Sequence, residues 1–194
     1  DSKGEALLSL PSGSYKFRTD YLGYSFGLLG DAPMAQLPSE TELTIDIESK
    51  SVPVTLLPTY GSEVLSIPLK APIYAYTPDG AYIGLSEVSD SSNSASFLLP
   101  IRPYKFRADY LGAQIWSSPS TGVPLEIVIP IAKAKVIVKQ DNDFLQNINV
   151  YVFNSAGAYL GITDVTKTDG TFEFTLVESD FKFRADYCGN QYWS

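Results

Sequence analysis

The sequence has no histidine and only one cysteine, Cys188, among its 194 residues. Without histidine the chain lacks the commonest general base and the commonest zinc ligand, which excludes triad hydrolases and zinc enzymes. One cysteine cannot close an intrachain disulfide, so apolar burial and sheet pairing must stabilise the fold. Basic residues are also scarce: 14 stand against 22 acidic ones, a formal net charge of −8. Long-range repulsion therefore argues against nucleic acid or an anionic membrane as a partner.

The sequence also has no long apolar run and no leader pattern. No stretch approaches the roughly 18 apolar residues that a membrane span needs, and no charged and then apolar segment precedes a cleavage site. We therefore expect the chain as given to be soluble. It begins at Asp1 inside a recognisable unit, so we expect it to be a piece of a longer polypeptide. No residue pattern indicates a catalytic group, a metal site or a bound cofactor.

The chain contains an internal repeat. The motif Tyr-Lys-Phe-Arg-Thr-Asp-Tyr-Leu-Gly at 15–23 returns in close variants at 104–112 and 181–189, at intervals of 89 and 77 residues. Residues 73–117 match residues 150–194 without a gap at 18 of 45 positions. Self-similarity at such spacing is the signature of a tandem array.

Side chains alternate in polarity within each copy. In the first motif Tyr15, Phe17 and Tyr21 fall on one face of a strand, and Lys16, Arg18 and Asp20 fall on the other. The aromatic residues Phe17, Phe106 and Phe183 are predicted to be central to three separate cores. Further alternating stripes, typical of strands, lie at 43–47, 125–129 and 135–139. The strands predicted for the second unit lie near 52–57, 68–76, 82–88, 94–99, 104–110, 114–117 and 124–130. Those predicted for the third unit lie near 133–139, 147–153, 159–165, 171–176 and 181–187, with a short one around 191–193.

Turn residues separate the predicted strands. Glycines at Gly80, Gly157 and Gly170 stand where a hairpin needs a positive φ. Short strands at intervals of about ten residues predict an all-β fold of tandem antiparallel β-sandwiches. The repeats predict three domains: residues 1–48, the C-terminal half of a first sandwich; 49–131, a complete second; and 132–194, a third without its last strand. No flexible linker separates the second and third, so we expect a stiff rod.

The stretch from Thr168-Asp169-Gly170 through the Lys-Phe-Arg-Ala-Asp-Tyr strand to Gly189-Asn-Gln-Tyr-Trp-Ser194 resembles the transthyretin-like, Cna-B or carboxypeptidase-regulatory-like sandwich repeats. Such Ig-like modules occur in large bacterial surface and secreted proteins, generally as non-catalytic stalks. The resemblance implies an extracellular structural role in an adhesin or filament, and no enzyme activity. Expected partners are neighbouring repeats, head-to-tail copies of the chain, and a cell-surface glycan or protein.

Arg-Thr-Asp or Arg-Ala-Asp recurs at 18–20, 107–109 and 184–186. Because an Arg and an Asp two apart share one face of a strand, we expect a solvated surface ion pair that also discourages edge pairing. The alternative is a receptor-binding tripeptide, which would need a mobile loop.

Two polar runs offer oxygen ligands of the kind that calcium takes: Asp141-Asn142-Asp143 and Asp90-Ser91-Ser92-Asn93. A calcium site needs six to eight ligands from several segments. Since Asn and Asp are also preferred turn residues, we expect plain turns.

Four aromatic residues recur in pairs at equivalent places: Trp116 with Trp193, and Tyr82 with Tyr159. The main expectation is that each Trp closes the end of a sandwich core. The alternative is a flat platform on which sugars stack, which would make the chain a carbohydrate-binding module.

Cys188 stands where the other copies have Leu22 and Leu111, so it is expected to be a small buried apolar residue. Residues 1–47 match only the back half of a unit, and the third unit stops at Ser194, before any counterpart of 125–129. We therefore expect unpaired strand edges at both ends. Residues 1–47 are expected to be completed by strands of upstream sequence or of a neighbouring copy.

Overall fold

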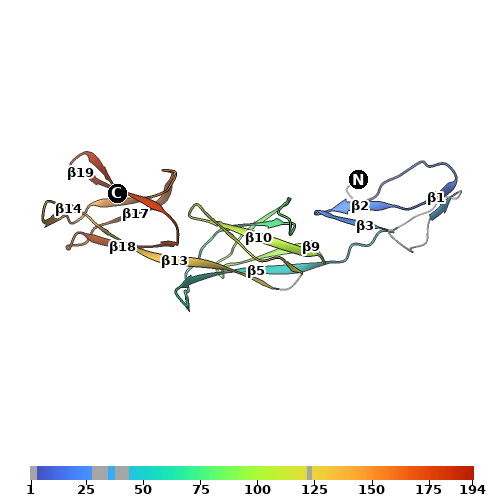
Figure 1. The fold of residues 1–194 in the computed structure, drawn as a ribbon, viewed down its shortest axis with the longest axis horizontal. Helices are drawn as coiled ribbons and strands as arrows, with labels where there is room; N and C mark the ends of the chain where they lie inside the picture. Colours follow the sequence, from blue (N-terminus) through green and yellow to red (C-terminus); the bar gives the residue numbers. More distant parts are fainter. Residues whose placement is uncertain (1–3, 28–34, 38–43, 122–123) are drawn as a thin grey trace.

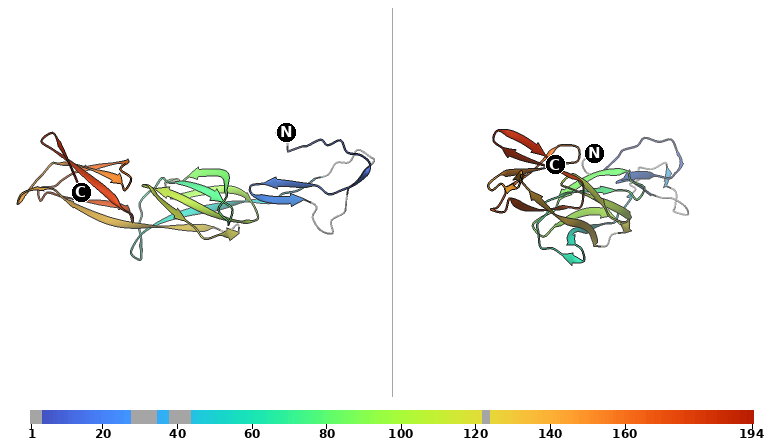
Figure 2. Two further views of the ribbon diagram at one scale, coloured as in Figure 1. Left: turned by 45° about the horizontal axis from the view of Figure 1, so that its top comes forward. Right: turned by 60° about the vertical axis from the view of Figure 1, so that its left-hand side comes forward.

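The computed structural model describes residues 4–27, 35–37, 44–121 and 124–194, and every regular element in these ranges is a β-strand. The strands form three parts in a row along the long axis: an N-terminal part, a middle sandwich and a last sandwich (Figure 1). The row persists when the view is turned (Figure 2). Across the described ranges no helix could span a membrane. The fold is all-β, as the sequence predicts.

The middle sandwich consists of two facing sheets. The strands of the first, in spatial order, are β11 (Ala113–Trp116), β10 (Pro103–Tyr110), β7 (Pro72–Tyr76) and β8 (Tyr82–Val88), with β12 (Ser120–Thr121) also on β10. The second contains β9 (Ser94–Pro100), β5 (Ser49–Tyr60) and β13 (Leu125–Ile137), with β6 (Glu63–Val64) at the end of β5. Neighbouring strands are antiparallel except β5 and β13, which are parallel.

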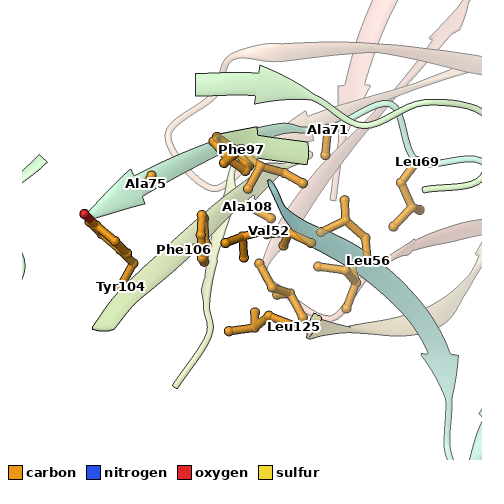
Figure 3. Packing of buried hydrophobic residues seen from close by; sticks show 14 of the residues in the cluster. Val52, Leu56, Leu69, Ala71, Ala75, Phe97, Tyr104, Phe106, Ala108 and Leu125 are labelled. Carbon is orange, nitrogen blue, oxygen red and sulfur yellow. The ribbon is translucent and has the colours of Figure 1, made fainter. Parts of the chain in front are cut away.

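Alternate residues of these strands point into one core, as a period of two requires. Figure 3 shows Val52 and Leu56 of β5 meeting Phe106 and Ala108 of β10 across the gap between the sheets. Phe106 is 1% exposed and its ring centroid lies 5.0 Å from that of Phe97. The prediction of a central aromatic is confirmed for this copy.

The last sandwich repeats this plan. Its first sheet has the order β17 (Tyr159–Val165), β16 (Asn149–Asn154), β19 (Phe181–Tyr187) and β20 (Asn190–Trp193). Facing it are β18 (Thr171–Val177), the second half of β13, and the small hairpin of β14 (Lys139–Gln140) and β15 (Asp143–Phe144). Phe183 packs against this core but is only half-buried, so the prediction for it holds in part.

The N-terminal part contains two strand pairs, β1 (Gly13–Tyr15) with β4 (Ala35–Leu37) and β2 (Arg18–Tyr21) with β3 (Tyr24–Gly27). The predicted strand at 15–21 is thus broken at Lys16 and Phe17. The described part of the chain has two hydrophobic cores, and Phe17 belongs to neither, so its prediction as a core centre is wrong. An alternating stripe makes a strand only where a partner strand lies beside it.

The other predicted strands match those observed within a few residues, and 82–88, 159–165 and 181–187 match at both ends. The two strands predicted at 124–130 and 133–139 are one continuous strand, β13. The strand predicted at 43–47 is an exception: residues 44–48 have no regular structure, and Leu43 lies outside the described residues. The glycines that were expected to have positive φ do so, at 101° for Gly80, 89° for Gly157 and 66° for Gly170. Glycine at these turn positions therefore indicated reliably where strands end.

Candidate functional site

One strand crosses the joint between the two sandwiches. Residues 125–130 of β13 pair with β5 in the middle sandwich, and residues 131–137 of the same strand pair with β18 in the last. The strand crosses the predicted domain boundary at 131/132 without a break. The backbone of Pro130 also accepts a hydrogen bond from Glu178 N at 2.7 Å. The β-ladder thus continues from one sandwich into the next.

A second contact at this joint comes from the β10–β11 hairpin. Its turn residue Leu111 packs against both hydrophobic cores, and so does Phe181 at the start of β19. The neighbouring Gly112, at φ 84°, lies so close to the last sandwich that an added Cβ would be 3.4 Å from Cβ of Asn154. The joint therefore includes a docked hairpin as well as a shared strand.

The same contact occurs between the N-terminal part and the middle sandwich. Leu22 and Tyr24 of the β2–β3 hairpin pack against the middle core, and the Tyr24 ring meets that of Tyr104 edge-on at 5.3 Å. The Tyr24 hydroxyl donates a hydrogen bond to Pro103 O. Burial, with the Tyr24 ring nearby, raises the pKa of Tyr104 to about 12.

The third hairpin of this kind carries Cys188, and its position is a correction to the sequence analysis. Cys188 is exposed rather than buried, although its backbone has the same left-handed conformation, φ 48°, as Leu22 and Leu111. The leucines are covered because their hairpins dock on a following sandwich. Position in a hairpin does not itself bury a side chain, so the comparison with the leucines misled the prediction.

The outer face of the middle sandwich carries a cluster of aromatic rings around one arginine. The guanidinium of Arg107 lies 4.8 Å from the ring centre of Tyr74, 5.5 Å from Tyr76 and 5.7 Å from Trp116. The Tyr82 ring packs on Tyr76 at 5.3 Å. We call these residues, with Asp109, the outer aromatic cluster.

Asp109 completes the cluster by pairing with Arg107. Nε of Arg107 lies 2.7 Å from Oδ1 of Asp109, and Nη2 donates to Oδ2 at 2.9 Å. Such a two-point contact between guanidinium and carboxylate fixes the plane of the guanidinium, which then stacks among the rings.

The last sandwich repeats the cluster position by position. Arg184 lies 4.4 Å from the Tyr151 ring, 5.4 Å from Phe153 and 5.8 Å from Trp193, and pairs with Asp186 at 2.9 Å. The Tyr159 ring packs on Phe153 at 5.3 Å. The cluster is thus part of the repeating unit.

The predicted Arg–Asp pair forms in all three copies, but its environment differs. The Arg18 and Asp20 side chains are 60% and 63% exposed, whereas that of Arg107 is only 19% exposed. The expectation of a solvated pair is right for the N-terminal copy and wrong for the other two, where rings cover the guanidinium. All three triplets lie in strands, β2, β10 and β19, and not in the loop that a receptor tripeptide needs.

The tryptophans do not close the ends of the cores, contrary to the main expectation. Trp116 and Trp193 lie on the outer faces of their sheets, 43% and 50% exposed. Tyr82 and Tyr159 are exposed to a similar degree beside them. Within each cluster the rings are inclined to one another, by 58° between Tyr76 and Trp116. Sugar stacking on these four residues stays a prediction.

The polar runs proposed as turns are turns. Asp90 Oδ1 accepts hydrogen bonds from the backbone N of Ser92 and Ser94, at 2.8 and 2.9 Å. Asn93 is buried and bonds the backbone of Ile67 and Leu69. Asp141 has φ 54°, in the left-handed region that turns use. In the described ranges no three acidic or cysteine side chains gather as metal ligands would.

The outer aromatic clusters were missed by the sequence analysis, but a signal for them exists. In Ile73-Tyr74-Ala75-Tyr76 the alternate residues Ile73 and Ala75 are buried, which puts both tyrosines on the other face. The same alternation puts Arg107 opposite to Phe106. Only the strand order, with β10 between β7 and β11, brings these outer residues together.

No protein-family model and no curated protein matches the sequence. Among solved structures the chain is similar to a double mutant of the shaft pilin SpaA from Lactobacillus rhamnosus GG, at 11% identity and a TM-score of 0.34, over 71% of this chain and 87% of that one. It is similar to a single B repeat unit of the collagen-binding surface protein Cna from Staphylococcus aureus, at 16% identity and a TM-score of 0.28, over 74% and 87%. It is also similar to a streptococcal ancillary pilin, at 12% identity and a TM-score of 0.31, over 91% of this chain and 66% of that one. Since all three TM-scores are below 0.5, the β-sandwich assignment rests on this chain's own strand order and pairing.

Proposed function

We propose that the chain is a non-enzymatic structural segment of a bacterial extracellular surface protein, an adhesin stalk or fibre built of tandem sandwiches. The observation that carries this proposal is the parallel pair of β5 and β13. Leu125 faces Val54 and Pro130 faces Thr59, so the pair extends over six positions. The surface location is supported by the sequence resemblance to stalk modules.

The parallel pair is suited to resisting tension. β5 and β13 lie along the long axis of the molecule, with the two ends of the chain toward opposite ends of the row (Figure 1). A pull on the ends therefore loads the bonds between these two strands in shear. All bonds of a sheared ladder carry the force together, whereas a hairpin pulled from its open end loses them one at a time. A segment that transmits force between a cell and a surface needs this geometry.

Single-molecule pulling on the ends of the chain tests the proposal. The middle sandwich should unfold at a higher force than the last sandwich, in whose described part no parallel pair occurs. Ile127→Ala, which removes a side chain 1% exposed under the pair, should lower that force, because forced unfolding follows the unfolding rate. Val128→Ala, on the outer face of the same strand at 53% exposure, is the matched control. Equal unfolding forces for the two sandwiches would contradict the stalk proposal.

A second candidate function is carbohydrate binding at the outer aromatic clusters. It is favoured by the half-exposed Trp116 and Trp193, whose rings lie on outer faces instead of in a core. Titration with glycans should then shift the tryptophan fluorescence, and Tyr82→Ala and Tyr159→Ala should weaken the shift. Fluorescence that no glycan changes would leave the clusters as packing alone.

A further inference from the structure

Lys105 lies over the exposed tryptophan of the outer aromatic cluster. Its Nζ is 4.9 Å from the ring centre of Trp116, and Trp116 is 43% exposed. Lys105 stands two residues before Arg107 on β10, which puts both on the outer face of the sheet, and it is directly across from Tyr76. The ammonium therefore occupies ring surface on which a sugar would stack.

Lys105 is the cation of this cluster that has no carboxylate of its own. Arg107 is paired with Asp109, whereas no carboxylate among the described residues lies within ion-pair distance of Lys105. The pKa of Asp79, in the nearby turn, is lowered mainly by a hydrogen bond with the Thr77 side chain and least by Lys105. The Lys105 ammonium can therefore pair with an acid group that a ligand brings.

The last sandwich has the same arrangement of rings but no cation over its tryptophan. The residue equivalent to Lys105 is Lys182, which faces Phe153 as Lys105 faces Tyr76. Lys182 is exposed, whereas Lys105 is half-buried. Within the described chain Lys182 makes no cation–π contact, and the cation near Trp193 is the arginine of its own cluster. The two clusters thus differ at one lysine.

This lysine changes what the middle cluster can bind. A neutral sugar that stacks on Trp116 has to displace the ammonium, whose attraction to the ring is then lost. A sugar that carries an acid group gives the displaced ammonium of Lys105 an ion pair in return. On Trp193 there is neither the loss nor the gain. The middle cluster is therefore expected to favour an acidic sugar over a neutral one.

Other classes of ligand fit the middle cluster less well. Three rings around a cation are typical of sites that bind quaternary ammonium groups, but here Arg107 already fills that position, 4.8 Å from the ring centre of Tyr74. An acidic peptide would pair with Lys105 but would leave the face of Trp116 without a stacked ring. A sugar acid makes both contacts at once.

We propose that the outer aromatic cluster of the middle sandwich binds acidic glycans, with a sugar ring stacked on Trp116 and its acid group paired with Lys105. The inference rests on the second candidate function, carbohydrate binding, and names the class of sugar. Lys105 determines the specificity, because it opposes a neutral sugar and pairs with an acidic one. The cluster around Trp193 does not distinguish the two.

Tryptophan fluorescence of the full chain tests the proposal with one reporter at a time. The chain has two tryptophans, so Trp193→Phe leaves Trp116 as the reporter and Trp116→Phe leaves Trp193. The probes are an oligogalacturonate and its methyl ester, which has the same sugar rings without the charges. At Trp116 the oligogalacturonate should bind about fivefold more tightly than the ester, the ratio that one exposed ion pair gives. At Trp193 the two should bind alike.

Lys105→Gln should abolish the preference at Trp116, because it removes both the cation on the ring and the partner of the acid group. The ester should then bind more tightly than it does to the unchanged site, and the oligogalacturonate less tightly. Lys182→Gln, the matched change in the last sandwich, is the control and should leave both affinities at Trp116 unchanged. A sulfated oligosaccharide whose binding depends on Lys105 in the same way would also support the inference and show that sulfate is accepted.

Three results would overturn the inference. The first is that neither acidic probe binds Trp116 more tightly than the ester, which would leave carbohydrate binding itself standing. The second is a preference that survives Lys105→Gln. The third is a polyglutamate peptide that binds as tightly as the oligogalacturonate, since the site would then read charge and not sugar. If no glycan changes the fluorescence, both the inference and the second candidate function fail, and the stalk proposal is unaffected.

Discussion

Arg107 shows how one sequence motif takes on different roles in different surroundings. The same Arg-x-Asp triplet is solvent-exposed in β2 and covered by three rings in β10 and β19. A guanidinium that is stacked on rings and bonded to a carboxylate is held on two sides, and a lysine cannot reproduce both contacts. The motif alone therefore does not determine what its arginine contributes.

Arg107→Ala should lower the free energy of unfolding by about 2 kcal/mol, since it removes the stacking and leaves the Asp109 carboxylate without its partner. Arg107→Lys should recover less than half of this loss. Arg18→Ala, in the exposed copy, should cost less than about 0.5 kcal/mol. Urea denaturation of the three variants gives the comparison, and equal losses at positions 18 and 107 would mean that the rings add nothing.

Tyr104 carries a buried hydroxyl for which the described residues offer no hydrogen-bond partner. The equivalent residue of the last sandwich is Phe181, which has no hydroxyl. Tyr104→Phe should therefore leave stability unchanged or raise it by up to about 1 kcal/mol. A loss larger than 1 kcal/mol in urea denaturation would show that the hydroxyl does have a partner.

The raised pKa of Tyr104 also makes the stability of the wild-type protein decrease at alkaline pH. The folded state holds the proton up to a pKa of about 12, above the ordinary value of 10.0. This contribution to stability is complete below pH 10 and is lost as pH rises from 10 toward 12. Melting temperatures measured across that range should fall less steeply for Tyr104→Phe than for wild type.

At the scale of strands, the cost of removing a core aromatic should follow its burial. Phe106→Ala should cost about 3 to 5 kcal/mol, the usual range for a fully buried ring. Phe183→Ala should cost less, because the ring is only half-buried. Phe17→Ala should cost least, since its ring joins no described core. Denaturant midpoints that fall in a different order would contradict this ranking.

The strands could be predicted from the sequence because polarity alternates and turn residues separate them. The failures share one cause: the sequence of a strand does not determine which strand will lie beside it. The stripe at Ile45 and Ile47 predicts a strand, yet no strand lies beside it in the described chain. Trp116 and Cys188 were placed by analogy between copies, whereas sheet order and the presence of a following sandwich determine their exposure.

For the whole molecule, the shared strand β13 should fix the angle between the two sandwiches. A Gly-Ser-Gly-Ser insertion between Pro130 and Ile131 should loosen the joint, broaden the small-angle scattering distance distribution and shorten its maximum. The same insertion in the turn at Ala156–Gly157 is the control and should leave the overall length unchanged. If both insertions leave the scattering unchanged, β13 does not set the angle and the docked hairpin alone holds the joint.

A strand shared by two sandwiches also links the order in which they form. Once the middle sandwich has folded, pairing of residues 125–130 with β5 holds the start of residues 131–137 extended and in place. When the last sandwich folds, part of the conformational entropy of its chain has then already been lost. β18 can pair directly with the edge of residues 131–137, which is already extended. Each unit would in this way nucleate the next one, so that folding proceeds along the rod in one direction, from the N-terminal side, like the neighbour-coupled folding of solenoid repeats.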